Sequence, residues 1–389
     1  MAEYKMVRLG DVCEQINGVS YKPADVYDSL TEKTTILLRA NNIFEDKLNY
    51  DELVFVDKKR ISENQYMKKG DILICASSGS KHLVGKAACL TEDKDLTFGA
   101  FCKVLRPKTV NPEYIKHYFF SPSYRTEISR LSEGANINNI KAADLDNLKI
   151  PLPSESIQNK IAKQLDKCVK IINNQKKALE KYDTLIKSRF IEMFGDILAG
   201  KYKFETRKLG EISEVGSSHR VFTTEFVEHG IPFYRGTEIG ELANGKIPQK
   251  PYYISEEHYQ RLIAQDSKPQ IGDLLMPSIC NKGQVWMVDT EEPFYYKDGR
   301  VLSISPNREI YNSKYLQYFM REKTLVEYPK LGSGSTFAEF KIFLLKDIDI
   351  LTPPLSLQND FASFVQQIDK SKFEIANSLK RLYNKGMLS

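Results

Sequence analysis

Residues 150–162 read IPLPSESIQNKIA, and residues 350–362 read ILTPPLSLQNDFA. In both stretches a short apolar run ends at prolines, and a Gln-Asn pair then lies near the start of a long segment with helical periodicity. Residues 70–73 (GDIL) return in the same way as residues 272–275 (GDLL). A period of about 200 residues is far longer than the roughly 20–50-residue units of solenoid proteins. It predicts two related domains in one chain, a pseudo-dimer suited to targets with two halves, of which DNA sites read by dimers are the leading example.

Both long segments carry apolar residues at alternating spacings of four and three, which is typical of a coiled-coil seam. We expect helices over 154–195 and 354–389, paired antiparallel because the two halves are related by a pseudo-two-fold. The alternative is two amphipathic helices, each packed only on its own domain. A helix of about 40 residues spans about 60 Å, so the pair would be a rigid spacer. The expected seam residues are Ile161, Leu165, Ile172, Leu179, Tyr182 and Ile186 in the first helix, and Phe361, Val365, Ile368, Ile375, Leu379 and Leu382 in the second.

The segments before the helices, residues 1–153 and 196–353, contain short runs rich in β-branched and aromatic residues, separated by turn residues. Such runs predict strands, for example at 71–76 and, in the second half, at 273–277. The expected fold class is α+β. It consists of two strand-rich domains related by a pseudo-two-fold and separated by an antiparallel coiled coil of two long helices.

Composition limits the possible function classes. The chain has 389 residues, too many for one ordinary domain, and no apolar run long enough to span a membrane. Its start lacks the apolar core of a signal peptide, and six cysteines form no C-x-x-C pair, so we expect a cytoplasmic protein with reduced thiols. Of the net charge of +5, the segment 154–195 carries +4 and the segment 356–389 carries +2, so the rest of the chain nets −1. Any nucleic-acid contact of the domains therefore depends on local patches.

Several segments resemble catalytic motifs, but each lacks residues that the motif requires. Asn111-Pro112-Glu113-Tyr114 lacks the second proline of the N-P-P-Y element of amino-methyltransferases, and Asn as helix cap with Pro following explains it better. Gly79–Ala87 has one residue too many between its glycines for a phosphate-binding loop, and it ends in Ala where Ser or Thr must reach magnesium. The Glu-x-Lys triplets at 45–47 and 92–94 lack the Pro-Asp partner of nuclease sites, and the five histidines form no metal-spaced pair. We expect no catalytic residue, no metal site and no bound cofactor in this chain.

Together these features resemble the specificity subunit of a type I restriction-modification system, over the whole chain. The most specific residues are the two Pro-containing stretches with Gln158-Asn159 and Gln358-Asn359. The Gly-Asp-Ile-Leu element with the later Val84-Gly85-Lys86 also resembles a target recognition domain; the second half departs here with Gly283-Gln284-Val285.

The resemblance implies a non-catalytic subunit in which two target recognition domains each read half of a split double-stranded DNA sequence. It implies partners that do the chemistry: two modification subunits, which bind S-adenosylmethionine and methylate adenine, and, where present, two restriction subunits, which use ATP and magnesium. It also implies that the helices separate the domains and dock the modification subunits, and that no membrane is involved.

Within that resemblance, polar loops after matched strands are the first candidates for contacts to phosphates and base edges. The expected DNA-binding residues in the first half are Arg39, Asn41, Ser77, Ser78, Ser80, Lys81, His82, Lys86 and Asn138. Those in the second half are Arg235, Thr237, Ser278, Asn281, Lys282 and Gln284.

Two other function classes stay open at this point. One is a structural scaffold that joins two protein partners without touching DNA. The other is the specificity chain of a type IIB-like system, with the same architecture and a fused nuclease-methylase partner. Sequence divergence between the two domains favours DNA reading, because domains that bind identical partners should stay alike, whereas domains that read different half-sites should not.

Overall fold

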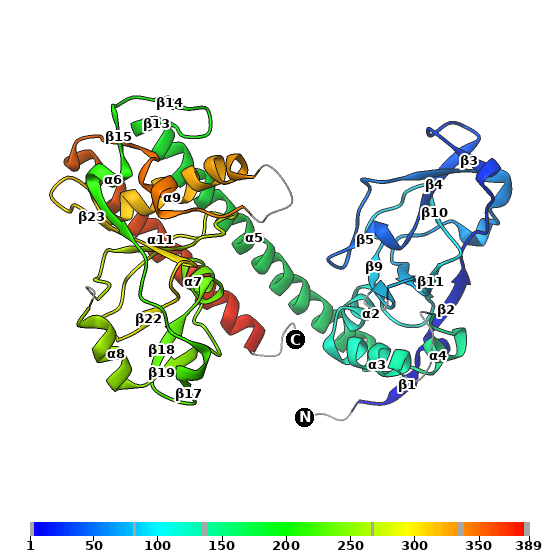
Figure 1. Cartoon of the computed structure of the whole chain (residues 1–389). Helices are drawn as coiled ribbons and strands as arrows, with labels where there is room; N and C mark the ends of the chain where they lie inside the picture. Colours follow the sequence, from blue (N-terminus) through cyan, green and yellow to red (C-terminus); the bar gives the residue numbers. More distant parts are fainter. Residues whose placement is uncertain (1–3, 81–82, 134–138, 266–267, 333–337, 385–389) are drawn as a thin grey trace. The chain divides into compact units, whose positions relative to one another are not determined.

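The computed structural model describes residues 4–80, 83–133, 139–265, 268–332 and 338–384 (Figure 1). Internal contacts divide the chain into two units, one of residues 1–177 and 376–389 and one of residues 178–375. The division falls inside each of the two longest helices, α5 (Glu155–Phe194) and α11 (Leu355–Asn384). Each unit therefore holds one strand-rich domain together with part of both helices.

The first domain contains two four-stranded sheets. In one, the antiparallel order is β2 (Cys13–Asn17), β11 (Cys102–Pro107), β8 (Ile72–Cys75) and β9 (Ala87–Cys89). In the other, the order is β10 (Leu96–Phe98), β4 (Thr34–Leu38), β7 (Val54–Asp57) and β3 (Val26–Tyr27), with β10 parallel to β4. Two small ladders complete the domain: β1 (Met6–Arg8) with β12 (Lys149–Pro151), and β5 (Ile43–Phe44) with β6 (Lys47–Leu48).

The second domain repeats both four-stranded sheets and the β1–β12 ladder but, among its described residues, not the β5–β6 ladder. Its first sheet has the order β16 (Ser213–Gly216), β23 (Val301–Pro306), β20 (Leu274–Pro277) and β21 (Trp286–Met287). Its second sheet has the order β22 (Tyr295–Tyr296), β18 (Ile231–Tyr234), β19 (Tyr252–Ile254) and β17 (Phe226–Val227), and again one pair, β22 with β18, is parallel. β15 (Thr206–Lys208) pairs with β24 (Asp349–Leu351), and β13 (Gly195–Asp196) pairs with β14 (Lys201–Tyr202). The prediction of two repeated, strand-rich domains in an α+β fold is confirmed.

Short helices accompany the sheets in both domains. The first domain has α1 (Leu9–Val12), α2 (Pro112–Phe119), α3 (Pro122–Glu133) and α4 (Ala142–Asn147). The second has α6 (Leu209–Ile212), α7 (Gly236–Ala243), α8 (Glu256–Ile263), α9 (Ser313–Glu327) and α10 (Ile342–Lys346). The side chains of Asn111 and Asn312 cap α2 and α9, which confirms the capping interpretation of Asn111.

The strand β8 shows why each domain forms layers. All four of its residues are buried, and they alternate between two hydrophobic clusters. Ile72 and Ile74 belong to the cluster that contains residues of α2, α3 and α5, whereas Leu73 and Cys75 belong to the cluster shared with the second sheet. A strand covered on both faces needs a continuous apolar run, which the sequence supplies.

The repeated Gly-Asp pair that precedes β8 and β20 has a structural role. Gly70 and Gly272 adopt φ angles of +91° and +93°, where a residue with a Cβ is strained. The following aspartates, Asp71 and Asp273, each accept a backbone hydrogen bond from three residues earlier in the chain, 2.8 Å long in both domains. Each also bonds an arginine of the neighbouring strand or the loop after it, Arg106 and Arg308 respectively. The motif thus closes a tight turn at the start of a buried strand.

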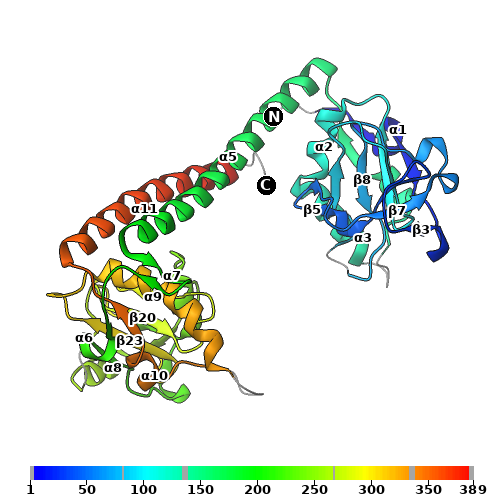
Figure 2. The same cartoon turned by 90° about the horizontal axis from the view of Figure 1, so that it is seen from above.

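The two long helices run antiparallel, as Figure 2 shows. Within the second unit, Phe190 of α5 contacts Phe361 of α11, and further along α5 Asp183 pairs with Lys372, which lies before the end of α11. Within the first unit, Gln175 donates a 3.0 Å hydrogen bond to Ser378. Residue numbers therefore rise on one helix as they fall on the other. Gln175 and Lys372 are polar residues at positions that continue the four-and-three spacing of the seam, and each contacts a residue of the opposite helix.

Candidate nucleic-acid interface

The Gln-Asn pairs fix each long helix to its domain. The side-chain oxygen of Gln158 accepts the backbone N–H of Asn111 at 2.9 Å, and its amide nitrogen donates to Pro153 O at 2.8 Å. Gln358 does the same with Asn312 and Pro353, at 3.0 and 2.9 Å, and also donates to Ile310 O at 3.0 Å. Both glutamines are buried. The glutamines of the most specific sequence motif therefore anchor the start of each long helix to its domain.

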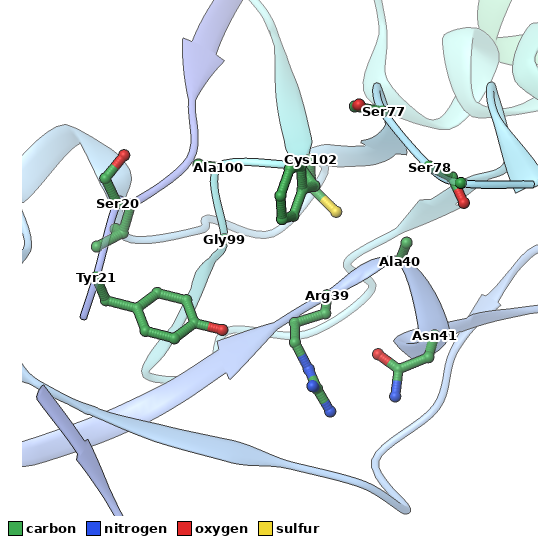
Figure 3. A pocket seen from close by; sticks show the side chains of 13 residues that line it. Ser20, Tyr21, Arg39, Ala40, Asn41, Ser77, Ser78, Gly99, Ala100 and Cys102 are labelled. Carbon is green, nitrogen blue, oxygen red and sulfur yellow. The ribbon is translucent and has the colours of Figure 1, made fainter. Parts of the chain in front are cut away.

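Four loops of the first domain meet at one edge of its sheets and enclose a cleft of about 660 Å³ (Figure 3). The loops follow β2, β4 and β8 and precede β11. The cleft brings together four of the predicted residues, Arg39, Asn41, Ser77 and Ser78, although they are up to 39 residues apart in sequence. It adds residues that the sequence analysis missed; those with a side chain suited to contacts are Ser20, Tyr21 and Phe101.

Arg39 is the cation of this cleft. Its Nε is buried and has no hydrogen-bond partner among the described residues, and its Nη2 lies 3.5 Å from Glu52 O. The side chain of Asn42 accepts the backbone N–H of Arg39 at 2.8 Å, which fixes the backbone from which the guanidinium projects. Because Arg39 is only half-buried and its guanidinium makes one long hydrogen bond to the described residues, it has donors left for an acceptor. Phosphate and base-edge oxygens are such acceptors.

The cleft also has an exposed aromatic wall. Phe101 is 71% exposed, an unusual position for a large apolar side chain, while its backbone oxygen accepts hydrogen bonds from Ala76 N and Ser77 N. An aromatic ring held by a rigid backbone can contact bases or the thymine methyl group.

Other predicted residues of the first half lie elsewhere. Ser80 is exposed, and its backbone N–H is bonded to Ser78. Lys86 is half-buried, directly precedes β9 and does not line the cleft. Lys81, His82 and Asn138 lie outside the described residues.

In the second domain the matching loops are tied to one another. Gly299 N donates to Ser217 Oγ, and Ser217 Oγ donates to Val301 O, both at 2.8 Å. Arg235, the counterpart of Arg39, is held by Glu238 and lies over the ring of Tyr252 at 4.4 Å. The hydrogen bond to Glu238 and the nearby carboxylate keep the pKa of Arg235 above its ordinary range. This arginine is therefore engaged within the domain, unlike Arg39.

One expectation for the second half needs correction. Ser278 was expected to contact DNA from a polar loop, but it is 1% exposed; its backbone N–H donates to Arg300 O and its backbone oxygen accepts from Phe340 N. Thr237, Asn281 and Lys282 are exposed, and Gln284 is half-buried with its side chain accepting from Lys282 N. These remain candidates.

Among the described residues, no group of three or more His, Cys, Asp or Glu side chains could hold a metal ion. Burial raises the pKa of Cys13, Cys89 and Cys102 to about 12, which disfavours the reactive thiolate. No helix in the described parts of the chain combines the length and apolar character that a bilayer crossing requires.

Comparisons with known proteins agree with this arrangement. A family model for the type I restriction modification DNA specificity domain matches residues 1–181 and, a second time, residues 201–382. Part of the chain is 43% identical over 173 residues to the type I restriction enzyme StySPI specificity subunit of Salmonella potsdam, covering 44% of this chain and 37% of that protein. It is 40% identical over 187 residues to the EcoKI specificity subunit of Escherichia coli, covering 48% of this chain and 40% of that protein. The chain thus matches about two fifths of the length of these relatives.

The fold also matches a solved structure, the type I restriction-modification S subunit from M. genitalium, with a TM-score of 0.58 at 14% identity, over 99% of this chain and 95% of that one. At this identity the likeness concerns the fold alone. The family model, in contrast, covers most of the chain in two copies that coincide with the internal repeat. The chain therefore belongs to the type I restriction modification DNA specificity family.

Proposed function

We propose that this chain is the DNA-recognition subunit of a type I restriction-modification complex. The first domain reads one half of a split double-stranded target, and the second domain reads the other half. The observation that carries the proposal is the cleft of the first domain. Its four loops place a half-buried arginine, whose guanidinium makes one long hydrogen bond to the described residues, beside an amide, two serines and an exposed ring. This is a set of donors and apolar surface that suits base edges and phosphates.

The partner subunits supply the chemistry in this proposal. Two modification subunits bind S-adenosylmethionine and methylate adenine in each half-site. Restriction subunits, where present, use ATP and magnesium. The helices α5 and α11 form the spacer that sets the distance between the domains and offers docking surface to the modification subunits. The complex acts on the genome in the cytoplasm.

DNA binding by the complex with modification subunits tests this function. Fluorescence anisotropy with genomic fragments should show binding that weakens steeply with salt, since phosphate contacts release counterions. Arg39→Ala should reduce the preference for target over competitor DNA. Arg60→Ala is a matched control, because Arg60 of the same domain does not line the cleft and is paired with Asp25 at 2.9 Å.

The same experiment separates the alternative functions. A scaffold would assemble with its partners and show no salt-dependent retention of DNA. A type IIB-like specificity chain would bind DNA equally well, but the partner purified with it would be one fused nuclease-methylase.

A further inference from the structure

A charged cluster in the second domain was not singled out by the sequence. Arg300 Nη1 lies 2.7 Å from Glu339 Oε2, and Lys341 pairs with the other oxygen of the same carboxylate. The side chain of Arg300 is 62% exposed, while that of Glu339 is 21% exposed. Two cations and one carboxylate leave a local charge of +1. Ion pairs this exposed add little to stability, so fold stability alone does not explain the cluster.

Backbone hydrogen bonds show which residues of the first domain occupy the same places. Ser278 N bonds Arg300 O as Ala76 N bonds Phe101 O, at 2.9 and 3.0 Å. Arg300 and Phe101 each immediately precede the matched strands β23 and β11. Arg300 is therefore the counterpart of Phe101, which forms the exposed wall of the first-domain cleft.

Glu339 has a counterpart of the same kind. Phe340 N bonds Ser278 O at 2.8 Å, and Ile140 N bonds Ala76 O at 2.7 Å. The residues before them, Glu339 and Asn139, are thus equivalent. At these two matched positions the first domain carries a ring and an amide, and the second domain carries a cation and a carboxylate. Surface positions that keep their backbone geometry and change their chemistry are what two readers of different sequences require.

We propose that Arg300 reads a guanine in the half-site of the second domain, and that Glu339 is the positioning residue that holds its guanidinium. The inference rests on the proposed function. A guanidinium donates two parallel hydrogen bonds to guanine O6 and N7, the commonest specific contact in the major groove. Among the described residues, Glu339 is the one acceptor of the Arg300 guanidinium and bonds only Nη1, so other guanidinium N–H groups remain for a base. The carboxylate of Glu339 is itself held by two residues. Lys341 pairs with Oε1, and Ser278 Oγ lies 3.5 Å from Oε2.

The test uses the whole complex, this chain with its modification subunits, and a DNA library with randomised positions that is sequenced for methylated adenine. Arg300→Ala should relax one guanine position of the second half-site, with discrimination reduced about 10- to 100-fold. Arg300→Lys keeps the charge but loses the planar fork, so it should relax the same position while overall affinity stays near that of the unchanged complex. Glu339→Ala should weaken the same position, and Glu339→Gln, which still accepts a hydrogen bond, should restore it.

Arg207→Ala is the matched control, because Arg207 is an exposed arginine of the same unit, 3.7 Å from Glu211 on α6. It should leave the motif unchanged. The inference is overturned if Arg300→Ala and Arg300→Lys both retain the full motif, or if they weaken all positions equally. A motif of the unchanged complex that has two defined half-sites, but no guanine sensitive to Arg300, rejects this inference and leaves the proposed function standing. An unchanged complex with no sequence preference rejects both.

Discussion

Replacing the buried glutamine of each repeat by alanine should destabilise one unit at a time. Gln358→Ala leaves the N–H of Asn312 and the carbonyl oxygens of Pro353 and Ile310 without their partner. An unsatisfied buried polar group costs about 1–3 kcal/mol. With some relief by water, we expect a loss of about 3–5 kcal/mol for Gln358→Ala. Gln158 makes two such bonds instead of three, so Gln158→Ala should cost about 2–4 kcal/mol.

The neighbouring asparagine gives a matched control. Asn359 accepts a single, exposed hydrogen bond from Asn312 Nδ2 at 2.9 Å. A partner exposed to water loses little, so Asn359→Ala should cost about 1 kcal/mol or less. The contrast between adjacent residues separates the buried network from any general effect of changing the start of α11.

The chain contains its own probe for the second unit. Trp286 is the only tryptophan, and it is buried in the second domain. The free energy of unfolding falls by about 1–3 kcal/mol per M urea. The expected loss of stability therefore lowers the urea midpoint of Gln358→Ala by at least about 1 M. Trp286 fluorescence should report that shift, whereas Gln158→Ala should shift the transition seen by circular dichroism more than the fluorescence transition. An unmoved Trp286 midpoint in Gln358→Ala, or an equal shift in Asn359→Ala, would refute the reasoning.

Three further predictions concern the helices and their surroundings. Leu179→Asp and Leu379→Asp should each destabilise the helix pair, because each places a charge in the seam. The measurement is the melting of the chain and its assembly with the proposed modification subunits. Unchanged melting and assembly in both variants would count against the pairing. A variant with four residues inserted after Gln175, and four more after Ile375 to restore the register of the helices, should recognise the same two half-sites. The number of bases between the half-sites should change, because the inserted residues lengthen both helices. Methylation at the original gap would contradict the spacer role. Burial lowers the pKa of His117 below its ordinary value despite the hydrogen bond to Asp166. As pH falls, the imidazole of His117 is therefore protonated in the unfolded chain before it is protonated in the folded one. The free energy of unfolding should decrease as pH drops below about 6.5, and it should decrease less in His117→Gln. Urea midpoints at pH 7.5 and 5.5 would show the difference.

Most of the architecture could be predicted from the internal repeat and from the four-and-three spacing of apolar residues, because both are local or periodic features of the sequence. The turn at Gly70-Asp71, the cap at Asn111 and the buried run of β8 are each determined by a few adjacent residues. The seam follows from spacing alone, and its polar positions found partners across the helices. Such features need no knowledge of distant contacts.

The residues proposed to contact DNA were only partly predictable, because they lie on loops that are far apart in the sequence. The offset between the repeats is 200 residues at Gln158 but 202 at Gly70, so Ser278 matches buried Ala76 and not half-buried Ser77. A match of serine with serine in the two loops therefore points to a residue that is buried in the second domain. The pair Arg300–Glu339 joins residues 39 positions apart, and only the packing of β23 beside the segment before α10 brings them together.

The central claim is that each domain reads its own half of one split target. The most direct test is to determine the methylation motif of the complex of this chain with its modification subunits on DNA of random sequence. The account predicts two short specified blocks separated by a fixed number of unspecified bases, with one methylated adenine in each block. A single continuous motif, or methylation without a fixed gap, would contradict it.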